Sequence, residues 1–76
     1  MITTVDVLPI GTKAVITEVD LEKIPLKLLE MGCLPGNDLE ILHIAPLGDP
    51  IYLNVNNGSF LAIRKESAHE IKVEIL

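Results

Sequence analysis

Aromatic residues are nearly absent from this chain, in which Tyr52 and Phe60 are the only two and Trp does not occur. Proteins that bind single-stranded nucleic acids or proline-rich peptides rely on aromatic side chains for stacking. Basic residues are also few, with six Lys and Arg against eleven Asp and Glu and a net charge of −5. Phosphate backbones are bound mainly by clustered basic residues, and these six are spread along the chain. We therefore expect no nucleic-acid partner.

Cysteine and long apolar segments are scarce as well. Cys33 is the only cysteine, which excludes an internal disulfide bond and is typical of a cytoplasmic protein. No uncharged apolar stretch approaches the ~20 residues that span a bilayer. The first residues lack the basic and then apolar pattern of a signal peptide. We expect a cytoplasmic protein that does not itself insert into a membrane.

Branched aliphatic residues dominate what is present. Hydrophobic residues form 49% of the 76 residues, and most of them are Leu, Ile and Val. A chain of this length builds one core, so residues 1–76 are expected to form a single domain. Side chains branched at Cβ fit the half-buried surface of a pleated sheet, which favours a small β-barrel.

Short apolar runs separated by Pro and Gly predict an all-β arrangement. In residues 38–44 the alternation changes phase after Ile41, which predicts a β-bulge. A single helical turn is expected at residues 66–68. The expected strands are residues 13–19, 38–44, 51–56, the arm that follows a turn at residues 57–58, and residues 71–75.

Residues 24–31 have a helical period instead. Ile24, Leu28 and Met31 are spaced i, i+4 and i+7, which places them on one face of a helix. Pro25 suits the first turn, and Gly32 suits the left-handed position after the last turn. Because two turns of helix are not stable alone in water, this helix must pack against the barrel.

An Asn-Gly dipeptide in the second half of the chain predicts a hairpin with a two-residue type I′ turn, because both residues tolerate positive φ. That turn places Val55 opposite Phe60 and Leu53 opposite Ala62, and these four residues are the predicted core face of the hairpin. The expected turn residues of the whole chain are Gly11, Gly32, Pro35, Gly36, Asn57 and Gly58. The elements together predict a mainly β, five-stranded SH3-like barrel with one short helix after the first strand, and closure of the barrel would hide its sheet edges.

Three blocks in order resemble one family. They are Leu8–Gly11, Lys27–Gly36, and a closing half formed by Pro46–Ile51, Leu61–Arg64 and Ala68–Val73. Their order and spacing are similar to those of the FeoA family, small cytoplasmic accessory proteins of bacterial ferrous iron uptake. The resemblance covers nearly the whole chain.

The resemblance implies an SH3-like barrel that acts with the membrane ferrous iron transporter, whose cytosolic part contains a GTPase. Similar modules form the C-terminal domain of iron-dependent repressors. Two positions depart from the family pattern. Lys27 stands where the family often has Arg, which loses the bidentate fork of a guanidinium. Cys33 replaces an aliphatic residue and suits a buried site as a small apolar side chain.

The residues that could ligate a metal do not form a strong pattern. Cys33, His43 and His69 are far apart in sequence, and the only E-x-x-H spacing joins Glu66 to His69 on a single helical turn. Di-iron proteins use two such pairs on long helices. We expect no cofactor, with Glu66 and His69 on the solvated surface. The alternative is a metal-binding or metal-sensing module like that of the repressors, with these four residues as ligands.

Catalysis is not expected. Residues 32–36 contain two glycines but lack the G-K-[ST] ending of a phosphate-binding loop, and no nucleophile is placed beside a base and an orienting group. The protein is therefore predicted not to be an enzyme, and not to hydrolyse GTP itself.

What the sequence offers is a surface for a partner. The helix carries more leucines than one buried stripe needs, so Leu26 or Leu29 should be partly exposed. We expect a non-catalytic adaptor that docks on the cytosolic, GTPase-containing part of the transporter, which would recruit it to the inner face of the membrane. Weak self-association stays open. The candidate contact residues are Leu26, Lys27, Leu29, Glu30, Cys33 and Leu34.

Overall fold

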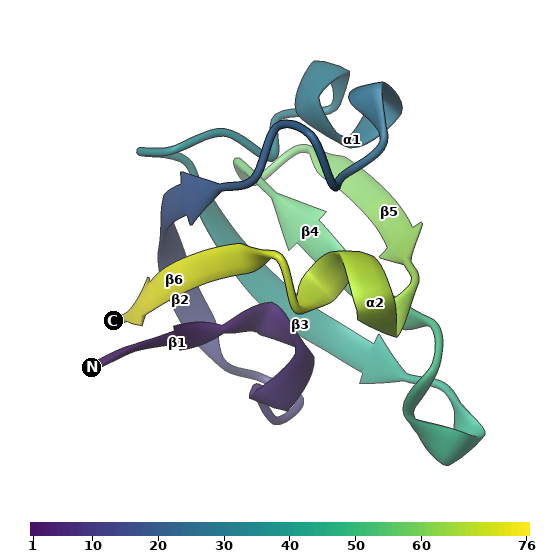
Figure 1. Ribbon diagram of the computed structural model, residues 1–76. Helices are drawn as coiled ribbons and strands as arrows, with labels where there is room; N and C mark the ends of the chain where they lie inside the picture. The colour runs from purple at the N-terminus through teal and green to yellow at the C-terminus, as the bar shows by residue number, and fades with distance from the viewer.

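Six antiparallel strands form one curled sheet in the computed structural model, which describes residues 1–76. The spatial order is β1-β6-β2-β3-β4-β5, and Figure 1 shows how the sheet wraps around a single interior. The strands are β1 (Ile2–Thr4), β2 (Lys13–Val19), β3 (Asp38–Ile44), β4 (Ile51–Val55), β5 (Ser59–Ile63) and β6 (Ile71–Ile75). Two α-helices, α1 (Leu26–Glu30) and α2 (Lys65–Ala68), and two 3-10 turns, η1 (Val5–Val7) and η2 (Pro46–Gly48), connect them.

The mainly β fold is confirmed, but the count of five strands is wrong. The additional strand is β1, whose three residues pair with β6 from Ile2 opposite Glu74 to Thr4 opposite Lys72. Three residues are too few to show an alternating pattern, so sequence reasoning could not find this strand. The helix consequently follows the second strand, not the first.

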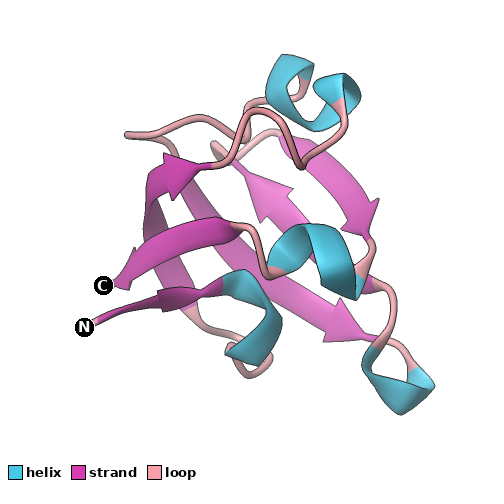
Figure 2. Ribbon diagram, viewed as in Figure 1, coloured by secondary structure: helices cyan, strands magenta, loops and turns pink.

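The two outermost strands, β1 and β5, do not pair with each other, so strand pairing does not close the barrel. This differs from the expected closure. Figure 2 shows α2 and η1 lying across the open side. Ala68 of α2 and Val5 of η1 are both fully buried there. Side-chain packing therefore completes the interior at the point where the strand ladder stops.

The predicted register of the hairpin is wrong by one residue. Asn56 and Asn57 have φ of 55° and 57°, whereas the φ of Gly58 is not positive, so the left-handed pair starts one residue earlier than expected. The sheet ladder then resumes with Val55 opposite Ser59. A shift of one residue turns every side chain of a strand to the other face.

Because of the shift, the opposite face of β5 from the predicted one lies in the core. Leu61 and Ile63 point inward, with 8% and 2% of their surface exposed, while Phe60 is 69% exposed and Ala62 is exposed as well. Two large aliphatic side chains enter the core in place of one aromatic ring and one methyl group. This register buries more of the branched aliphatic surface that makes up the rest of the core.

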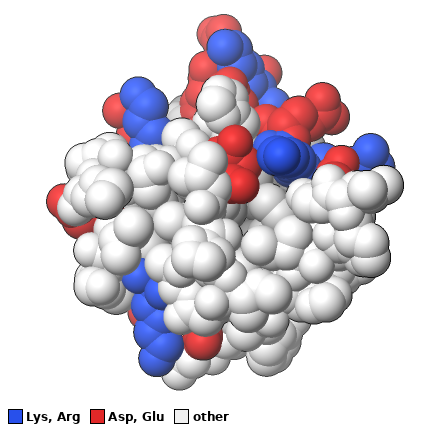
Figure 3. Space-filling model, turned by 90° about the horizontal axis from the view of Figure 1, so that it is seen from below, with Lys and Arg blue, Asp and Glu red and all other residues white.

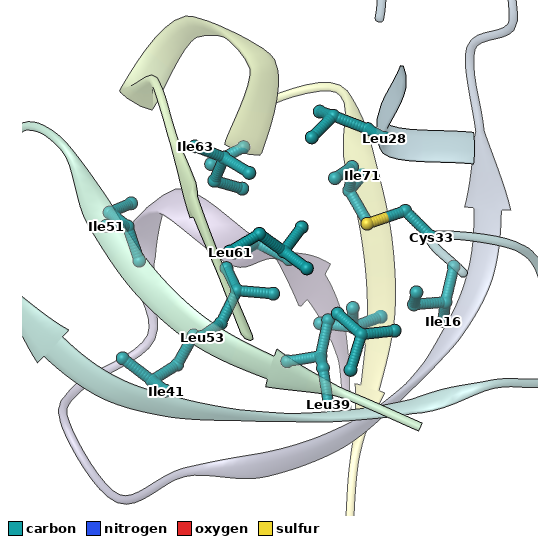
Figure 4. Close-up of a cluster of buried hydrophobic side chains, with 14 of the residues drawn as sticks. Ile16, Leu28, Cys33, Leu39, Ile41, Ile51, Leu53, Leu61, Ile63 and Ile71 are labelled. Atoms are coloured by element: carbon teal, nitrogen blue, oxygen red, sulfur yellow. The ribbon is translucent and has the colours of Figure 1, made fainter. Parts of the chain in front are cut away.

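Seventeen buried apolar residues form one core. Figure 4 shows the Cys33 sulfur directed at Ile71 within this cluster. Cys33 is fully buried, as expected for a packing residue, and burial raises the pKa of its thiol to about 11. The predicted β-bulge is confirmed, because the register of β3 against β4 shifts between Ile41 and His43.

Helix α1 is shorter than the predicted range of residues 24–31. Pro25 precedes the helix in an extended conformation instead of lying in its first turn. Ile24 and Leu28 are buried on one face, as the spacing predicts. Gly32 follows with φ of 105°, and a Cβ there would lie 3.4 Å from a methyl carbon of Val55. No helical segment of the structure has the length and hydropathy that a membrane span requires.

Candidate docking site

An apolar groove of about 440 Å3 lies between α1 and the edge of β5. Helix α1 borders one side because its buried stripe holds it against the barrel, and β5 borders the other. The groove is lined by Pro25, Lys27, Leu28, Met31, Phe60, Leu61 and Ala62.

The apolar surface continues from this groove over β4 and β3. A second hollow of about 390 Å3 shares three lining residues with the first and is lined only by apolar residues: Leu42, Tyr52, Leu53, Phe60, Leu61 and Ala62. We call the two hollows together the α1–β5 surface. Large contiguous apolar areas on soluble proteins mark sites of interaction.

Phe60 lines both hollows of this surface. Its ring is exposed because the register of β5 turns Leu61 and Ile63 inward. Sequence reasoning assigned Phe60 to the core and so missed its place on the surface. The available signal in the sequence was that Leu61 and Ile63 together offer more aliphatic volume to the core than Phe60 and Ala62 do.

Lys27 is the one charged residue that lines the groove. The ion pairs of the structure involve Lys23, Arg64, Lys72, His69 and the N-terminal ammonium, and none involves Lys27. A groove of apolar side chains therefore has one unpaired positive charge at its border.

The structure places the other predicted contact residues differently. Leu26 and Leu34 are exposed, at 68% and 42%, and Glu30 is exposed too, but none of the three lines the groove. Leu29 is half-buried and packs against the core. Cys33 is fully buried, so its side chain cannot reach a partner, and the inclusion of Cys33 in a contact surface is corrected.

The alternative metal ligands are not brought together. Cys33 lies in the core, His43 lies against the ring of Tyr52 with ring centres 5.6 Å apart, and His69 contacts Asp6 with 3.1 Å between Nδ1 and Oδ2. Glu66 is exposed on α2. No three His, Cys, Asp or Glu side chains converge in a way that could hold a metal ion.

Asp6 links η1 to α2 on the open side of the sheet. The Thr4 hydroxyl donates to one oxygen of the Asp6 carboxylate, and His69 contacts the other. Burial acts to raise the pKa of Asp6, but the hydrogen bonds from Thr4 and His69 and the nearby His69 charge hold it below its ordinary value of 3.8. These contacts tie the first turn of the chain to the helix that precedes β6.

Charge is distributed unevenly over the surface. Figure 3 shows the face that lies at the bottom of Figure 1, where η1 and η2 are found. Most of this face is uncharged; the majority of its basic and acidic residues lie along the upper border, and a few more lie at the left and lower left. The ionic residues of the acidic chain thus leave broad areas free of charge.

The curled six-stranded sheet with its short connecting helices places the molecule among the SH3-like barrel domains. Residues 3–75 match the family model described as the FeoA domain, and the chain belongs to the FeoA family. Both expectations from the sequence, the family and the SH3-like fold, are confirmed.

Three relatives illustrate the range of the family. A fusion of the Fe(2+) transport protein A with the Fe(2+) transporter FeoB from Porphyromonas gingivalis is 34% identical over 67 residues, which are 87% of this chain but only 8% of that protein. The structure of a FeoA-like protein from Clostridium acetobutylicum is 32% identical, with a TM-score of 0.86 over 99% of this chain and 87% of that one. Stenotrophomonas maltophilia FeoA, described as a prokaryotic SH3 domain protein complexed with zinc, is 27% identical, with a TM-score of 0.77 over 95% of this chain and 89% of that one.

Proposed function

We propose that this protein is a non-catalytic accessory protein of ferrous iron transport that docks on the cytosolic part of the ferrous iron transporter. The α1–β5 surface is the docking site in this proposal. The protein acts in the cytoplasm and is recruited to the inner face of the membrane by its partner.

The observation that carries the proposal is the fused relative. In the Porphyromonas gingivalis protein a segment similar to 87% of this chain is joined to the transporter FeoB in one polypeptide. Covalent fusion keeps two domains at high effective concentration, which favours even a weak contact between them. In this proposal the FeoA domain contacts the transporter through a surface of its own.

The α1–β5 surface supplies what such a contact requires. Binding energy at protein interfaces is concentrated in a few buried aromatic and aliphatic side chains. Phe60 offers an exposed ring, with Met31 and Leu28 beside it in the groove. Lys27 provides a charge at the border of the site.

Co-purification with the intact transporter tests the proposal. Phe60→Ser combined with Lys27→Glu should reduce recovery of the complex at least about tenfold, since truncation of a hot-spot residue costs about 2 kcal/mol or more and about 1.4 kcal/mol corresponds to a factor of ten. Both side chains are exposed, so the double variant should keep a cooperative thermal transition.

Leu47→Ser is the matched control. Leu47 is a fully exposed apolar residue of η2 and lines neither hollow of the α1–β5 surface. Its replacement should leave recovery of the complex unchanged. Equal recovery with all variants would falsify this docking site, and failure of the unaltered protein to co-purify would reject docking on the transporter.

A further inference from the structure

Strand β5 forms one edge of the sheet and pairs only with β4. On the β3 side of β4, the Asn56 N–H donates to the Asp38 carbonyl at 2.8 Å; on the β5 side, the Gly58 N–H donates to the Val55 carbonyl at 3.3 Å. Backbone groups alternate in direction along a strand. The odd-numbered residues of β4 therefore bond to β5, and the even-numbered residues bond to β3.

The register identifies the backbone groups of β5 that stay free. Ser59, Leu61 and Ile63 lie opposite the odd-numbered residues of β4, so they form the bonded pairs. Phe60 and Ala62 consequently direct their N–H and C=O groups away from β4. No loop, turn or helix of the chain forms a backbone hydrogen bond with either residue.

The residues of β5 have none of the features that usually block pairing with another chain. Natural sheets protect their edges with charged residues, Pro, bulges, very short strands or a covering helix or loop. On the open side of this sheet α2 and η1 form no backbone hydrogen bond with Phe60 or Ala62. Strand β5 contains five uncharged residues without Pro, and its register with β4 is uninterrupted. The free backbone groups of Phe60 and Ala62 lie on the same border that the apolar groove follows.

We infer that the groove between α1 and β5 binds an extended segment of the partner, which adds to the sheet as a strand beside β5. The inference rests on the proposed function and specifies how the partner is held. Backbone hydrogen bonds to Phe60 and Ala62 supply affinity, and alternate apolar side chains of the segment enter the groove beside Leu28 and Met31.

Charge specifies the chemistry of this segment further. Lys27 is the only charged residue of the groove and has no ion-pair partner in the chain. A carboxylate in the bound segment would complete this pair in partly apolar surroundings, where ion pairs are weakened least by solvent. The occupant is therefore an apolar segment that carries at least one Asp or Glu.

Amide hydrogen exchange of the full chain tests the inference without any substitution. The probe is the purified cytosolic part of the ferrous iron transporter, added in excess. Added strand pairing should slow the exchange of the Phe60 and Ala62 amides at least about tenfold, because a new hydrogen bond must open before exchange. Binding that leaves both amides unprotected overturns strand addition but keeps the proposed function.

Ala62→Pro and Ala62→Val form the matched pair of variants. Proline removes the outward N–H of position 62 without removing a bond to β4, and an edge strand accepts it where the N–H faces solvent. Valine keeps the N–H and adds similar bulk. Ala62→Pro should weaken binding of the transporter's cytosolic part at least about tenfold, while Ala62→Val should change it less than about threefold.

Two further outcomes separate the alternatives. Equal binding by the Pro and Val variants overturns the inference, whereas no binding by any form, including the unaltered chain, rejects the proposed function itself. Protection of Phe60 and Ala62 in the protein alone, accompanied by a dimer in sedimentation, would show that β5 pairs with a second copy and would also overturn the inference.

Discussion

The two edge strands of the sheet, β1 and β5, differ in length and in what surrounds them. Strand β1 has three residues, and the ammonium of Met1, which precedes the strand, pairs with the carboxylate of Glu74. The chain then turns into η1, which is held by the contacts of Asp6 with Thr4 and His69. Strand β5 has five uncharged residues, and its free side borders an apolar groove.

The difference shows that protection of an edge is local and selective in this fold. A very short, polar edge such as β1 disfavours pairing with other chains. Strand β5 is neither very short nor polar. A small domain has only marginal stability, so an edge that is open to aggregation is a disadvantage for it. The inferred strand addition assigns the open edge to a partner and leaves the short edge closed.

The largest expected effect is the difference in stability between alanine substitutions at two neighbouring residues of β5. Leu61→Ala should lower the free energy of unfolding by about 2–4 kcal/mol, because it leaves a cavity in the core. Phe60→Ala should change it by less than about 0.5 kcal/mol, because the ring is exposed. Urea unfolding at 25 °C measures both. The opposite ranking would restore the register expected from an Asn57-Gly58 turn.

The protected edge should respond to acid through Asp6. The folded-state pKa of Asp6 is lowered, so its stabilising effect is complete above the ordinary value of 3.8 and is lost as pH falls through the folded-state pKa. Asp6→Asn should reduce the free energy of unfolding at pH 7 by about 1 kcal/mol, through loss of charged hydrogen bonds.

Thermal unfolding between pH 7 and pH 2 measures this effect. The variant should show a shallower loss of stability below about pH 4 than the unaltered protein, since it no longer binds a proton at this position on unfolding. Glu22→Gln, at an exposed residue whose side chain forms no ion pair, is the control and should behave like the unaltered protein. Parallel curves for the Asp6 variant and the unaltered protein would contradict the assignment.

A smaller effect is expected at the turn that leads into β5. Asn56→Ala should cost about 1 kcal/mol of stability, because alanine disfavours the left-handed conformation at φ of 55°. Gly58→Ala should cost less, because φ is not positive there and a Cβ would meet only the Asn56 carbonyl at 3.9 Å. Thermal denaturation compares the two. A larger loss for Gly58→Ala would place the left-handed pair at Asn57 and Gly58.

The smallest effect on stability is expected when the open edge is given a charge. Ala62→Lys should change the free energy of unfolding by less than about 0.5 kcal/mol, yet reduce aggregation at high protein concentration. Thr3→Lys on the edge that is already protected should leave aggregation unchanged. Static light scattering over a concentration series measures both. An equal decrease for the two variants would remove the contrast between the edges.

Much of the fold could be predicted from the sequence because local patterns determine it. The strand over residues 13–19, the bulge after Ile41 and the packing stripe of Ile24 and Leu28 follow from residue spacing and are observed. Family blocks that depend on turn residues, such as Gly32 and Gly36 with positive φ, predicted the family correctly.

What could not be predicted depends on packing between distant segments. Strand β1 is defined only by its pairing with β6, at the other end of the chain. The hairpin register buries Leu61 and Ile63 instead of Phe60. The burial of these two aliphatic side chains outweighed the preference of Asn-Gly for a type I′ turn. The same register brought Phe60 to the groove, so the candidate docking site was predicted only in part, through Lys27.

Because Cys33 is buried, the reactivity of its thiol can serve as an intrinsic probe of unfolding. Because Cys33 is fully buried and burial raises its thiol pKa to about 11, little reactive thiolate is present at pH 7 while the barrel is intact. Alkylation of Cys33 therefore requires that the barrel first opens. The rate at which this one sulfur is modified reports the population of opened molecules, with no label added to the chain and no disturbance of either edge.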